Sequence, residues 1–577
     1  MHGGVGWARA VLALVAVVAA GALLVSGGSG ADPRTPRGLT GMPPPFLGTA
    51  VVGSGRLTAA IDAYGDVVDL RAPGPAGRAL IDNPSDRQEA GTVPADTGVV
   101  PWVSLGSRPA RPLWTADSLA QRYRPRTNTV VTIARFGSAW VRIAYAAGDS
   151  LLACRIEAGK GIRVSMRSNE PAAARRLRCK GGRARRTIRT AEREDRRWLR
   201  RARPLGSKAP AWAQRMYVRS LLVLRALTER RTGAVAAGAR DGWAYVWPRD
   251  ASAAALAYAA AGYRAEAERV VRFLLGLGLE DAARFHGDGS PVPGRAAQGD
   301  AIGWVAAAAK AAGIFGSTRR PAQVLSPTDP SPWRNRSDYQ EGEPGDYLGN
   351  ALASHADGTK TVLYGPKSSR RLVRRLGDPS SGLDSAAAWA VEPFSQPSLL
   401  GAARQTMLAL IHRRGRFGIT PGEAWPGEDP WTAPTAWTAW SLAALARRES
   451  GSRARTDRRA ALRLLAGLRR AATPDGALPE RVDARTGVPR STTPLAWSHA
   501  FAILALLELW PSPNCIECPG CKAGNAMPFE QGGATPGLPA RPRLPPRRSR
   551  PRPRRGRRPS ARGRAAPSCA APRPRGR

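Results

Sequence analysis

A change in the spacing of apolar residues constrains the fold of this chain more than any other feature. Between residues 43 and 170, apolar and polar residues alternate in short runs separated by turns that contain glycine. A period of two is typical of strands that bury one face, so we expect an antiparallel β-sandwich there. Between residues 209 and 510, apolar residues recur at helical spacing, with Gly- and Pro-rich connections. This second part is therefore expected to be all α-helical.

Two stretches of the first part predict β-hairpins. Residues 55–70 alternate on both sides of a Tyr-Gly-Asp turn, and residues 129–146 turn at Phe-Gly-Ser. Two further short strands, residues 151–156 and 162–166, flank a Gly-Lys-Gly turn. Because no combination of catalytic residue types stands out here, we expect this part to have a packing or carbohydrate-accessory role.

The helical segments of the second part are separated by loops, as in a helical barrel whose loops gather at one end. Loops on such a rigid scaffold are where binding and catalytic sites usually lie. A charged segment, residues 171–208, connects the two parts and predicts a solvated linker helix, with polyanion binding as the weaker alternative. The predicted helices are residues 211–231, 251–262, 263–279, 301–312, 396–413, 435–448, 457–472 and 498–509.

The two ends of the chain differ from the rest in composition. Residues 1–31 place an arginine ahead of an apolar run and small residues after it. This pattern predicts a signal peptide or, as the alternative, an uncleaved N-terminal membrane anchor, so we expect a secreted or cell-envelope protein. Residues 511–577 are rich in Pro and Arg with almost no aliphatic side chains, which predicts a disordered tail.

The formal net charge of +44 suggests a nucleic-acid partner at first sight. The arginines, however, cluster in residues 175–203 and in the C-terminal tail, while the aromatic stretches are balanced in charge. We therefore expect no specific nucleic-acid partner. Adhesion of the tail to an acidic envelope or to nucleic acid stays open as an alternative.

Cysteine is sparse, which excludes a disulfide-dense scaffold. A bridge between Cys154 and Cys179 is compatible with the sequence but is not required by it. Cys515, Cys518 and Cys521 resemble part of a zinc site, yet a fourth nearby ligand is missing from the sequence, so we predict no metal. We expect no other cofactor, and calcium has no ligand loop of recognisable spacing.

Residues 240–251 combine two tryptophans and a tyrosine with Asp241, Arg249 and Asp250, just before an alanine-rich helical segment. Flat apolar rings beside fixed hydrogen-bonding groups suit a sugar, which has apolar ring faces and a rim of hydroxyls. Arg249 and Asp250 offer donors next to an ionised acceptor, so they suit neighbouring hydroxyls. The alternative is a buried aromatic cluster with a structural ion pair.

Four later loops again place Asp or Glu close to Trp or Tyr. Hydrolysis of an acetal needs a carboxylic acid to protonate the departing oxygen and a carboxylate to assist water or to attack carbon. Aromatic surroundings raise the pKa of such an acid. The recurrence of this combination predicts a carbohydrate-processing site. The residues concerned are Gln298, Asp300, Trp304, Tyr339, Glu341, Trp425, Trp431, Glu480 and Trp497.

In order and spacing, several stretches resemble glycoside hydrolase family fifteen, which contains glucoamylases, glucodextranases and related trehalases. The strands at residues 55–65 resemble the β-sandwich that precedes the catalytic domain of bacterial members. The resemblance implies an (α/α)6 barrel and hydrolysis with inversion at the anomeric carbon. The matching stretches of the helical part are residues 247–250, 298–300, 338–341, 430–437, 478–480 and 494–498.

The resemblance also implies a role for each matching residue. Glu341 takes the place of the general acid and Glu480 that of the general base, while Arg249 and Asp250 would hold the glucose at the non-reducing end. The function that follows is release of glucose from α-glucans, and we expect the enzyme to be a monomer. The other substrate-binding residues would be Trp247, Gln298, Asp300, Trp304, Tyr339, Trp425, Trp431 and Trp497.

Two positions depart from the family pattern. Gln340 replaces the tryptophan that commonly precedes the acid, and Ile419 stands where some members carry a substrate-holding arginine, with Arg416 as the nearest substitute. Glu343 or Glu423 is therefore an alternative acid. A catalytically silent glucan-binding protein and a trehalase-type hydrolase remain alternative functions. The sequence leaves the linkage preference open.

Overall fold

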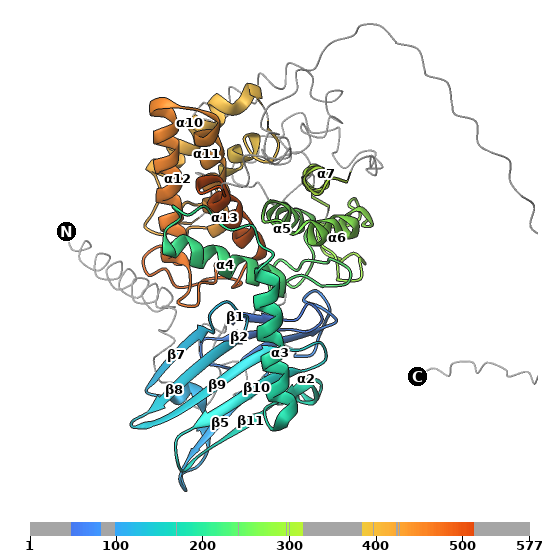
Figure 1. Ribbon diagram of the computed structural model, residues 1–577, viewed down its shortest axis with the longest axis vertical. Helices are drawn as coiled ribbons and strands as arrows, with labels where there is room; N and C mark the ends of the chain where they lie inside the picture. Colours follow the sequence, from blue (N-terminus) through green and yellow to red (C-terminus); the bar gives the residue numbers. More distant parts are fainter. Residues whose placement is uncertain are drawn as a thin grey trace, which may run out of the picture. The chain divides into compact units, whose positions relative to one another are not determined.

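The computed structural model has antiparallel sheets in its N-terminal part and helices in its C-terminal part, in the order that the apolar spacing predicted (Figure 1). The segments that connect the described elements contain glycine, proline and arginine. The structure describes residues 48–81, 98–168, 170–239, 242–295, 297–298, 300–314, 383–395, 397–422, 425 and 427–512.

The described strands of the N-terminal part form three sheets. Their bounds are β1 Gly48–Gly53, β2 Thr58–Asp62, β3 Val67–Ala72, β4 Arg78–Ala79, β5 Val100–Leu105, β6 Arg111–Pro112, β7 Ser118–Tyr123, β8 Val130–Phe136, β9 Ala139–Ala147, β10 Leu152–Ala158, β11 Ile162–Arg167 and β12 Leu177–Arg178. The strand orders are β1-β2-β3-β4, β12-β10-β9-β8-β7 and β11-β5-β6.

Both predicted hairpins are confirmed, because β2 pairs antiparallel with β3 and β8 pairs antiparallel with β9. The strands on the two sides of the Gly-Lys-Gly turn also form, but they separate after it. β11 pairs with β5, whereas β10 pairs with β9 and β12. The chain therefore passes from one sheet to another at this turn.

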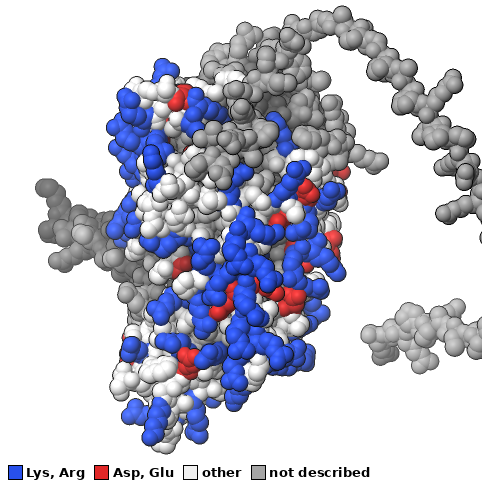
Figure 2. Space-filling view, viewed as in Figure 1, with Lys and Arg blue, Asp and Glu red and all other residues white. Residues whose placement is uncertain are grey.

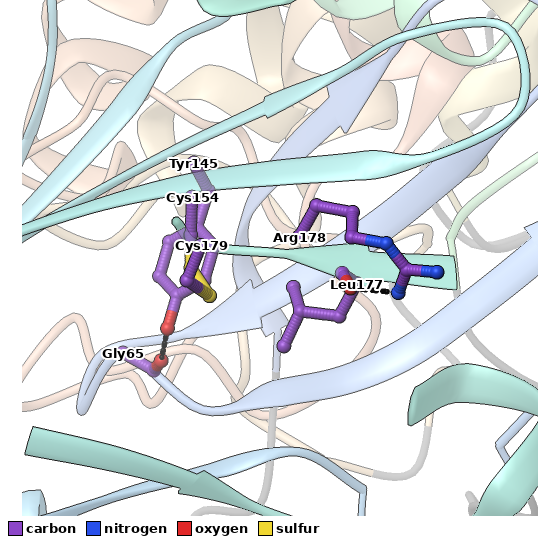
Figure 3. Close-up of a disulfide and its surroundings, with 6 residues drawn as sticks. All are labelled: Gly65, Tyr145, Cys154, Leu177, Arg178 and Cys179. Atoms are coloured by element: carbon purple, nitrogen blue, oxygen red, sulfur yellow. Dashed lines mark hydrogen bonds between the residues drawn. A yellow bond between two sulfur atoms is a disulfide. The ribbon is translucent and has the colours of Figure 1, made fainter. Parts of the chain in front are cut away.

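A disulfide links Cys154 in β10 to Cys179, the residue after β12 (Figure 3). β12 pairs in parallel with the start of β10, which brings the two cysteines together. Close to the bridge, the Tyr145 hydroxyl donates a hydrogen bond of 2.8 Å to the carbonyl oxygen of Gly65, in the turn of the first hairpin (Figure 3). The bridge that the sequence left open is thus present.

The charged segment between the two parts contains helices α2 (Pro171–Arg176) and α3 (Gly181–Leu199). We expected a solvated linker helix, but α3 is solvated on one face alone. Ala184 and Ile188 pack on Ala146, Leu151 and Ala153 of the sheet region. Ala184 and Ile188 are four residues apart and are separated by arginines, so the buried face was not evident from the sequence.

The helices of the C-terminal part form where the sequence predicted them; α7 has the predicted bounds, and the others differ at one end or both. α5, for example, begins three residues before the predicted start, at Pro248, because proline fits the first turn of a helix. The bounds are α4 Ala211–Ala226, α5 Pro248–Ala260, α6 Arg264–Leu275, α7 Ala301–Ala312, α10 Leu400–His412, α11 Thr432–Arg448, α12 Gly451–Ala471 and α13 Ala496–Leu509.

Helices α5, α11 and α13 lie at the centre of the helical part. α13 packs against α4, α5 and α11, and α5 also packs against α6 and α7. Almost every side chain of α11 and α13 is buried, as expected for helices that are apolar on all sides. Closure into an (α/α)6 barrel stays a prediction, because residues 315–382 lie outside the described part of the chain.

Over the described ranges, no helix has both the length and the apolar character needed to cross a membrane. The predicted signal or anchor, residues 1–31, lies outside these ranges, as do the tail and its cysteines from residue 513 onward.

Arg219 of α4 joins the sheets to the helices. Its guanidinium donates to the Asn128 side-chain oxygen at 3.0 Å and to the Thr127 carbonyl oxygen at 2.9 Å. It also lies over the Tyr123 ring, with the guanidinium carbon 3.5 Å from the ring centroid. The Asn128 amide in turn donates to the Leu222 carbonyl oxygen on α4, at 2.9 Å. The loop after β7 is thereby held on α4 by buried polar contacts.

We predict that replacing both cysteines of the bridge, Cys154→Ser with Cys179→Ser, lowers the free energy of unfolding by about 3 kcal/mol, because the unfolded chain regains the entropy of an open loop. The two cysteines are 25 residues apart in the sequence. Urea unfolding followed by circular dichroism measures the change. Cys569→Ser is the control for removing a thiol, and equal stability of the double variant and the wild type would contradict the prediction.

Candidate functional site

The residues predicted for the site lie at the N-terminal ends of several helices. Arg249 and Asp250 are in the first turn of α5, Asp300 is the residue before α7, and Trp497 is in the first turn of α13. Trp431 likewise precedes α11. Contacts of Arg249 with Asp300 and Trp497 join the starts of α5, α7 and α13. The Thr432 hydroxyl at the start of α11 donates to the Ser498 hydroxyl on α13 at 2.8 Å. The structure therefore brings together side chains that are far apart in the sequence.

Arg249 is the centre of this group. Its Nη1 atom donates to Asp300 Oδ2 at 2.8 Å and to Gln298 Oε1 at 3.2 Å, and its Nε atom lies 3.8 Å from Asp250 Oδ2. The guanidinium carbon lies 4.8 Å from the centroid of the Trp497 ring. The side chains of Arg249 and Asp300 are 3% and 0% exposed, so this is a buried ion pair. These motif residues therefore lie together in space, and their role in binding a sugar stays a prediction.

Burial is the main cause that raises the pKa of Asp250 to about 7; Arg249 opposes the shift, and the negative charges of Glu480 and Asp300 add to it. Burial also raises the pKa of Asp300, again against the effect of Arg249. The influence of Glu480 on Asp250 indicates that the two carboxyl groups belong to one electrostatic environment. A carboxyl with a pKa near neutrality can act as hydrogen-bond donor or acceptor at physiological pH.

Glu480 lies in the connection between α12 and α13, and both oxygens of its half-buried carboxylate accept hydrogen bonds. Trp243 Nε1 donates to Oε1 at 3.2 Å, and the Ser491 hydroxyl donates to Oε2. The backbone is also fixed, since the N–H of Glu480 donates to the Thr492 carbonyl and its own carbonyl accepts from the N–H of Thr432, both at 2.9 Å. Two donors thus orient the carboxylate.

Sequence reasoning missed these two donors as members of the site. Trp243 stands four residues before Trp247, inside the stretch that the sequence singled out, so its position carried a signal. Ser491 carried none, because its contact with Glu480 depends on the path of the loop between residues 480 and 491.

The Glu480 loop is anchored by a buried histidine. His499 Nε2 accepts from the backbone N–H of Leu478 at 2.9 Å, so Nδ1 carries the proton and donates to the Ser220 hydroxyl, also at 2.9 Å. Burial lowers the pKa of His499 to about 3, and the charge of Arg219 acts in the same direction. The neutral imidazole therefore holds the loop over the whole physiological pH range.

The predicted aromatic residues divide between the site and the core. Trp425 and Trp431 meet edge to face, with ring centroids 4.9 Å apart. Arg295 lies over the Trp247 ring at 5.4 Å from its centroid. Trp304 is fully buried and packs against the rings of Trp389, Phe394 and Phe501, at centroid distances of 5.0, 5.2 and 5.9 Å.

Several predicted residues lie outside the described part of the chain, so the structure does not place them. These are Glu341, the residue assigned as general acid, together with Tyr339, Gln340, Glu343, Glu423 and Asp241. Ile419 is buried, and its N–H donates to the Thr435 hydroxyl at 3.0 Å. Arg416, the proposed substitute for the missing arginine, is exposed and lies over Phe417 at 5.5 Å from the ring centroid. Within the ranges that the structure describes, no cluster of three or more His, Cys, Asp or Glu side chains is arranged to hold a metal ion.

The fold of the chain is similar to that of a bacterial glucoamylase. A crystal structure of a bacterial glucoamylase complexed with acarbose matches 82% of this chain and 97% of its own, with 11% sequence identity and a TM-score of 0.51. Weaker matches are a wild-type glycosidase, with 19% identity over 52% of this chain and 97% of its own and a TM-score of 0.38, and the glucoamylase from Saccharomycopsis fibuligera, with 14% identity over 53% and 96% and a TM-score of 0.37. No family model and no curated protein matches the sequence. The first match alone supports the glucoamylase-like fold that the motifs implied.

The raised pKa of Asp250 predicts a pH-dependent stability. Between about pH 4 and pH 7 the folded protein keeps a proton that the unfolded chain has released, so this residue makes folding less favourable as the pH rises. We expect Asp250→Asn to remove that loss, and the unfolding free energy of the wild type to fall relative to the variant by on the order of a few kcal/mol between pH 4 and pH 8.

Urea unfolding of both proteins at several pH values measures this difference. Asp281→Asn, the same change at an exposed carboxylate, is the control. Parallel pH profiles for the wild type and Asp250→Asn would show that the prediction is wrong.

Proposed function

Starting from this glucoamylase-like fold, we propose that the protein is a glycoside hydrolase. In this proposal it releases glucose from the non-reducing ends of α-glucans with inversion at the anomeric carbon. The observation that carries the proposal is the oriented carboxylate of Glu480, which shares an electrostatic environment with the Arg249–Asp250 pair. The enzyme acts as a monomer without a cofactor, on oligosaccharides or polysaccharides.

Glu480 is the general base. Trp243 donates to one oxygen of its carboxylate and Ser491 to the other. In this role the carboxylate accepts a proton from a water molecule as the water oxygen attacks the anomeric carbon. The two donors hold the carboxylate in one orientation, which favours attack from one face of the sugar ring.

Arg249 and Asp250 hold the terminal glucose. The contacts of Arg249 with Asp300 and Gln298 fix the plane of the guanidinium, so its other N–H groups have a set direction. Asp250 sits beside it with a pKa near 7, and it can accept from one sugar hydroxyl or donate to another. Trp425 and Trp431 offer ring faces and edges to the apolar faces of the sugars. Trp497 lies against Arg249, and Trp247 lies against Arg295.

The general acid in this proposal is Glu341, with Glu343 and then Glu423 as alternatives; all three come from the sequence pattern. An inverting enzyme needs its two carboxyl groups roughly 6.5–9.5 Å apart, so that a water molecule fits beneath the sugar. The acid must therefore lie across from Glu480 at about this separation.

We propose that the protein acts outside the cytoplasm, secreted or held at the cell envelope. The predicted N-terminal signal or anchor supports this, and so does the disulfide between Cys154 and Cys179. Disulfides persist mainly in oxidising compartments.

A catalytically silent glucan-binding protein is the second candidate. The buried Ile419, at a place where some family members carry a substrate-holding arginine, favours it, because Arg416 lies exposed on Phe417 instead of compensating. Retardation of the protein in glucan-containing gels without any hydrolysis would support this candidate over the enzyme.

Hydrolysis assays on starch, dextran and trehalose test the proposal, with the anomer of the released glucose followed by NMR. We expect β-glucose to appear first from at least one glucan. Turnover of trehalose alone would instead favour a trehalase-type hydrolase. Release of α-glucose as the first product, or no turnover of any of the three, would overturn the proposed mechanism.

We predict that Glu480→Gln lowers kcat by about 10²- to 10⁴-fold, because the amide cannot accept the proton of the attacking water. Ser491→Ala should lower kcat less and leave the KM nearly unchanged, since it removes one orienting bond and keeps the carboxylate. Glu428→Gln changes an exposed glutamate in a neighbouring loop and is the matched control. Equal activity of Glu480→Gln and the control would rule out Glu480 as the base.

A further inference from the structure

The outer face of α3 is a continuous row of arginines. The row consists of exposed arginines that are three or four residues apart and so lie on one face: Arg186, Arg189, Arg193 and Arg197 in the helix, and Arg200 directly after it. Figure 2 shows Lys and Arg side chains gathered over α3 in the centre of the view. The helix has 19 residues, which corresponds to a length of about 28 Å. We call this row the α3 arginine face.

Two of the three acidic residues of α3, Glu192 and Asp195, are buried and point to the protein, so they do not neutralise this face, whereas the third, Glu194, is half-buried. Asp195 is buried, accepts from the Asn128 N–H at 2.7 Å and pairs with Arg225 at 3.1 Å. Glu192 is also buried and pairs with Arg124 at 2.7 Å. Its second oxygen is 3.6 Å from Arg196, beside the row.

Over the described ranges, the central arginines of the row have no carboxylate partner, although Arg193 donates to the Thr190 hydroxyl at 3.2 Å. Among the residues that the structure describes, no carboxylate lies within ion-pair distance of Arg189, Arg193 or Arg197. These three are at i, i+4 and i+8, where like charges repel and weaken the helix. An anionic partner that lies along the row removes this repulsion and releases counterions.

The chain extends the row at both ends. Arg178 and Lys180 are exposed just before the helix, and Arg201 is exposed just after it, although Arg201 pairs with Glu266. The first helical residues, Gly181 and Gly182, have open space around their Cα atoms, so an anion can approach the N–H groups of the first turn. The positive potential is therefore linear and longer than the helix.

The aromatic and large apolar side chains of α3 are buried, and this restricts the kind of partner that the face can bind. The single aromatic side chain of α3, Trp198, is buried and stacks on Tyr263 with centroids 4.0 Å apart, so the helix offers no exposed ring for a base to stack on. Its apolar residues Ile188 and Leu199 are buried as well, so it offers nothing to insert into a lipid surface. We propose that the α3 arginine face binds a linear phosphate polymer without bases, such as poly(glycerol phosphate), along the helix axis.

The test compares two triple variants of the full-length chain. The first is Arg189→Gln, Arg193→Gln and Arg197→Gln on α3. The second is Arg455→Gln, Arg459→Gln and Arg463→Gln on α12, which removes the same charge from exposed arginines with the same i, i+4, i+8 spacing. Because both variants keep the arginine-rich tail, its contribution to binding is the same in each. Circular dichroism and thermal unfolding check that both variants fold.

Binding of fluorescent poly(glycerol phosphate) is measured at several salt concentrations. We expect the α3 variant to bind at least about tenfold more weakly at 50 mM salt, and the slope of log K against log salt to fall by about 2, as three lost phosphate contacts require. The α12 variant should change binding much less. Equally weakened binding of both variants would show that only the net charge of the protein matters. Unchanged binding of both variants would show that another part of the chain binds the polymer. Either result overturns the proposal.

Two further probes separate this partner from other polyanions. An oligothymidylate with the same number of phosphates should bind no more tightly than the polymer, and vesicles of phosphatidylglycerol should show no dependence on the three α3 arginines. Tighter binding of the oligonucleotide through α3 would replace the proposal with nucleic-acid binding. Loss of vesicle binding in the α3 variant, with polymer binding intact, would replace it with membrane binding. The test does not depend on glucan hydrolysis, so it is independent of the proposed function.

Discussion

The helical part depends on one buried cation. Arg249 keeps its proton under all ordinary conditions, and its burial requires anionic and polar partners that are also buried. Those partners are Asp300, Gln298 and Asp250, with the Trp497 ring on one side. They come from the starts of α5, α7 and α13, so the charge of one side chain keeps three helix ends together. A sugar-binding group at this position is therefore held rigidly by the three helix ends.

Glu480 is held by a different set of contacts that leads to the sheets. The loop before it is anchored by His499, whose second nitrogen bonds to Ser220 on α4. The neighbouring residue on α4, Arg219, is bound to the loop after β7. The N-terminal sheets and the proposed general base therefore have adjacent supports on the same helix. This arrangement gives the first part of the chain a structural role in the site that its own composition did not reveal.

The sequence was informative where periodicity or motif order carried the signal. The two hairpins and the helices followed from apolar spacing. The family resemblance assigned Arg249, Gln298 and Asp300 to one site, but the contacts among them came from the structure. The buried face of α3 was not predicted, because arginines separate its apolar residues. The bond from Ser491 to Glu480 could not be predicted either, since it depends on the path of a loop and not on residue type.

The disulfide has a mechanical consequence. Cys179 lies just before α3, and its partner is in β10, so the covalent bond joins the base of that helix directly to the sheet. If the chain is stretched from its two ends, the tension passes through the sulfur atoms and bypasses the residues between them. Strand β11 and helix α2 lie within that bypassed segment and would stay slack until the bond breaks. In the connecting segment, helix α3 follows the bridge and would carry the load, whereas α2 would be spared it.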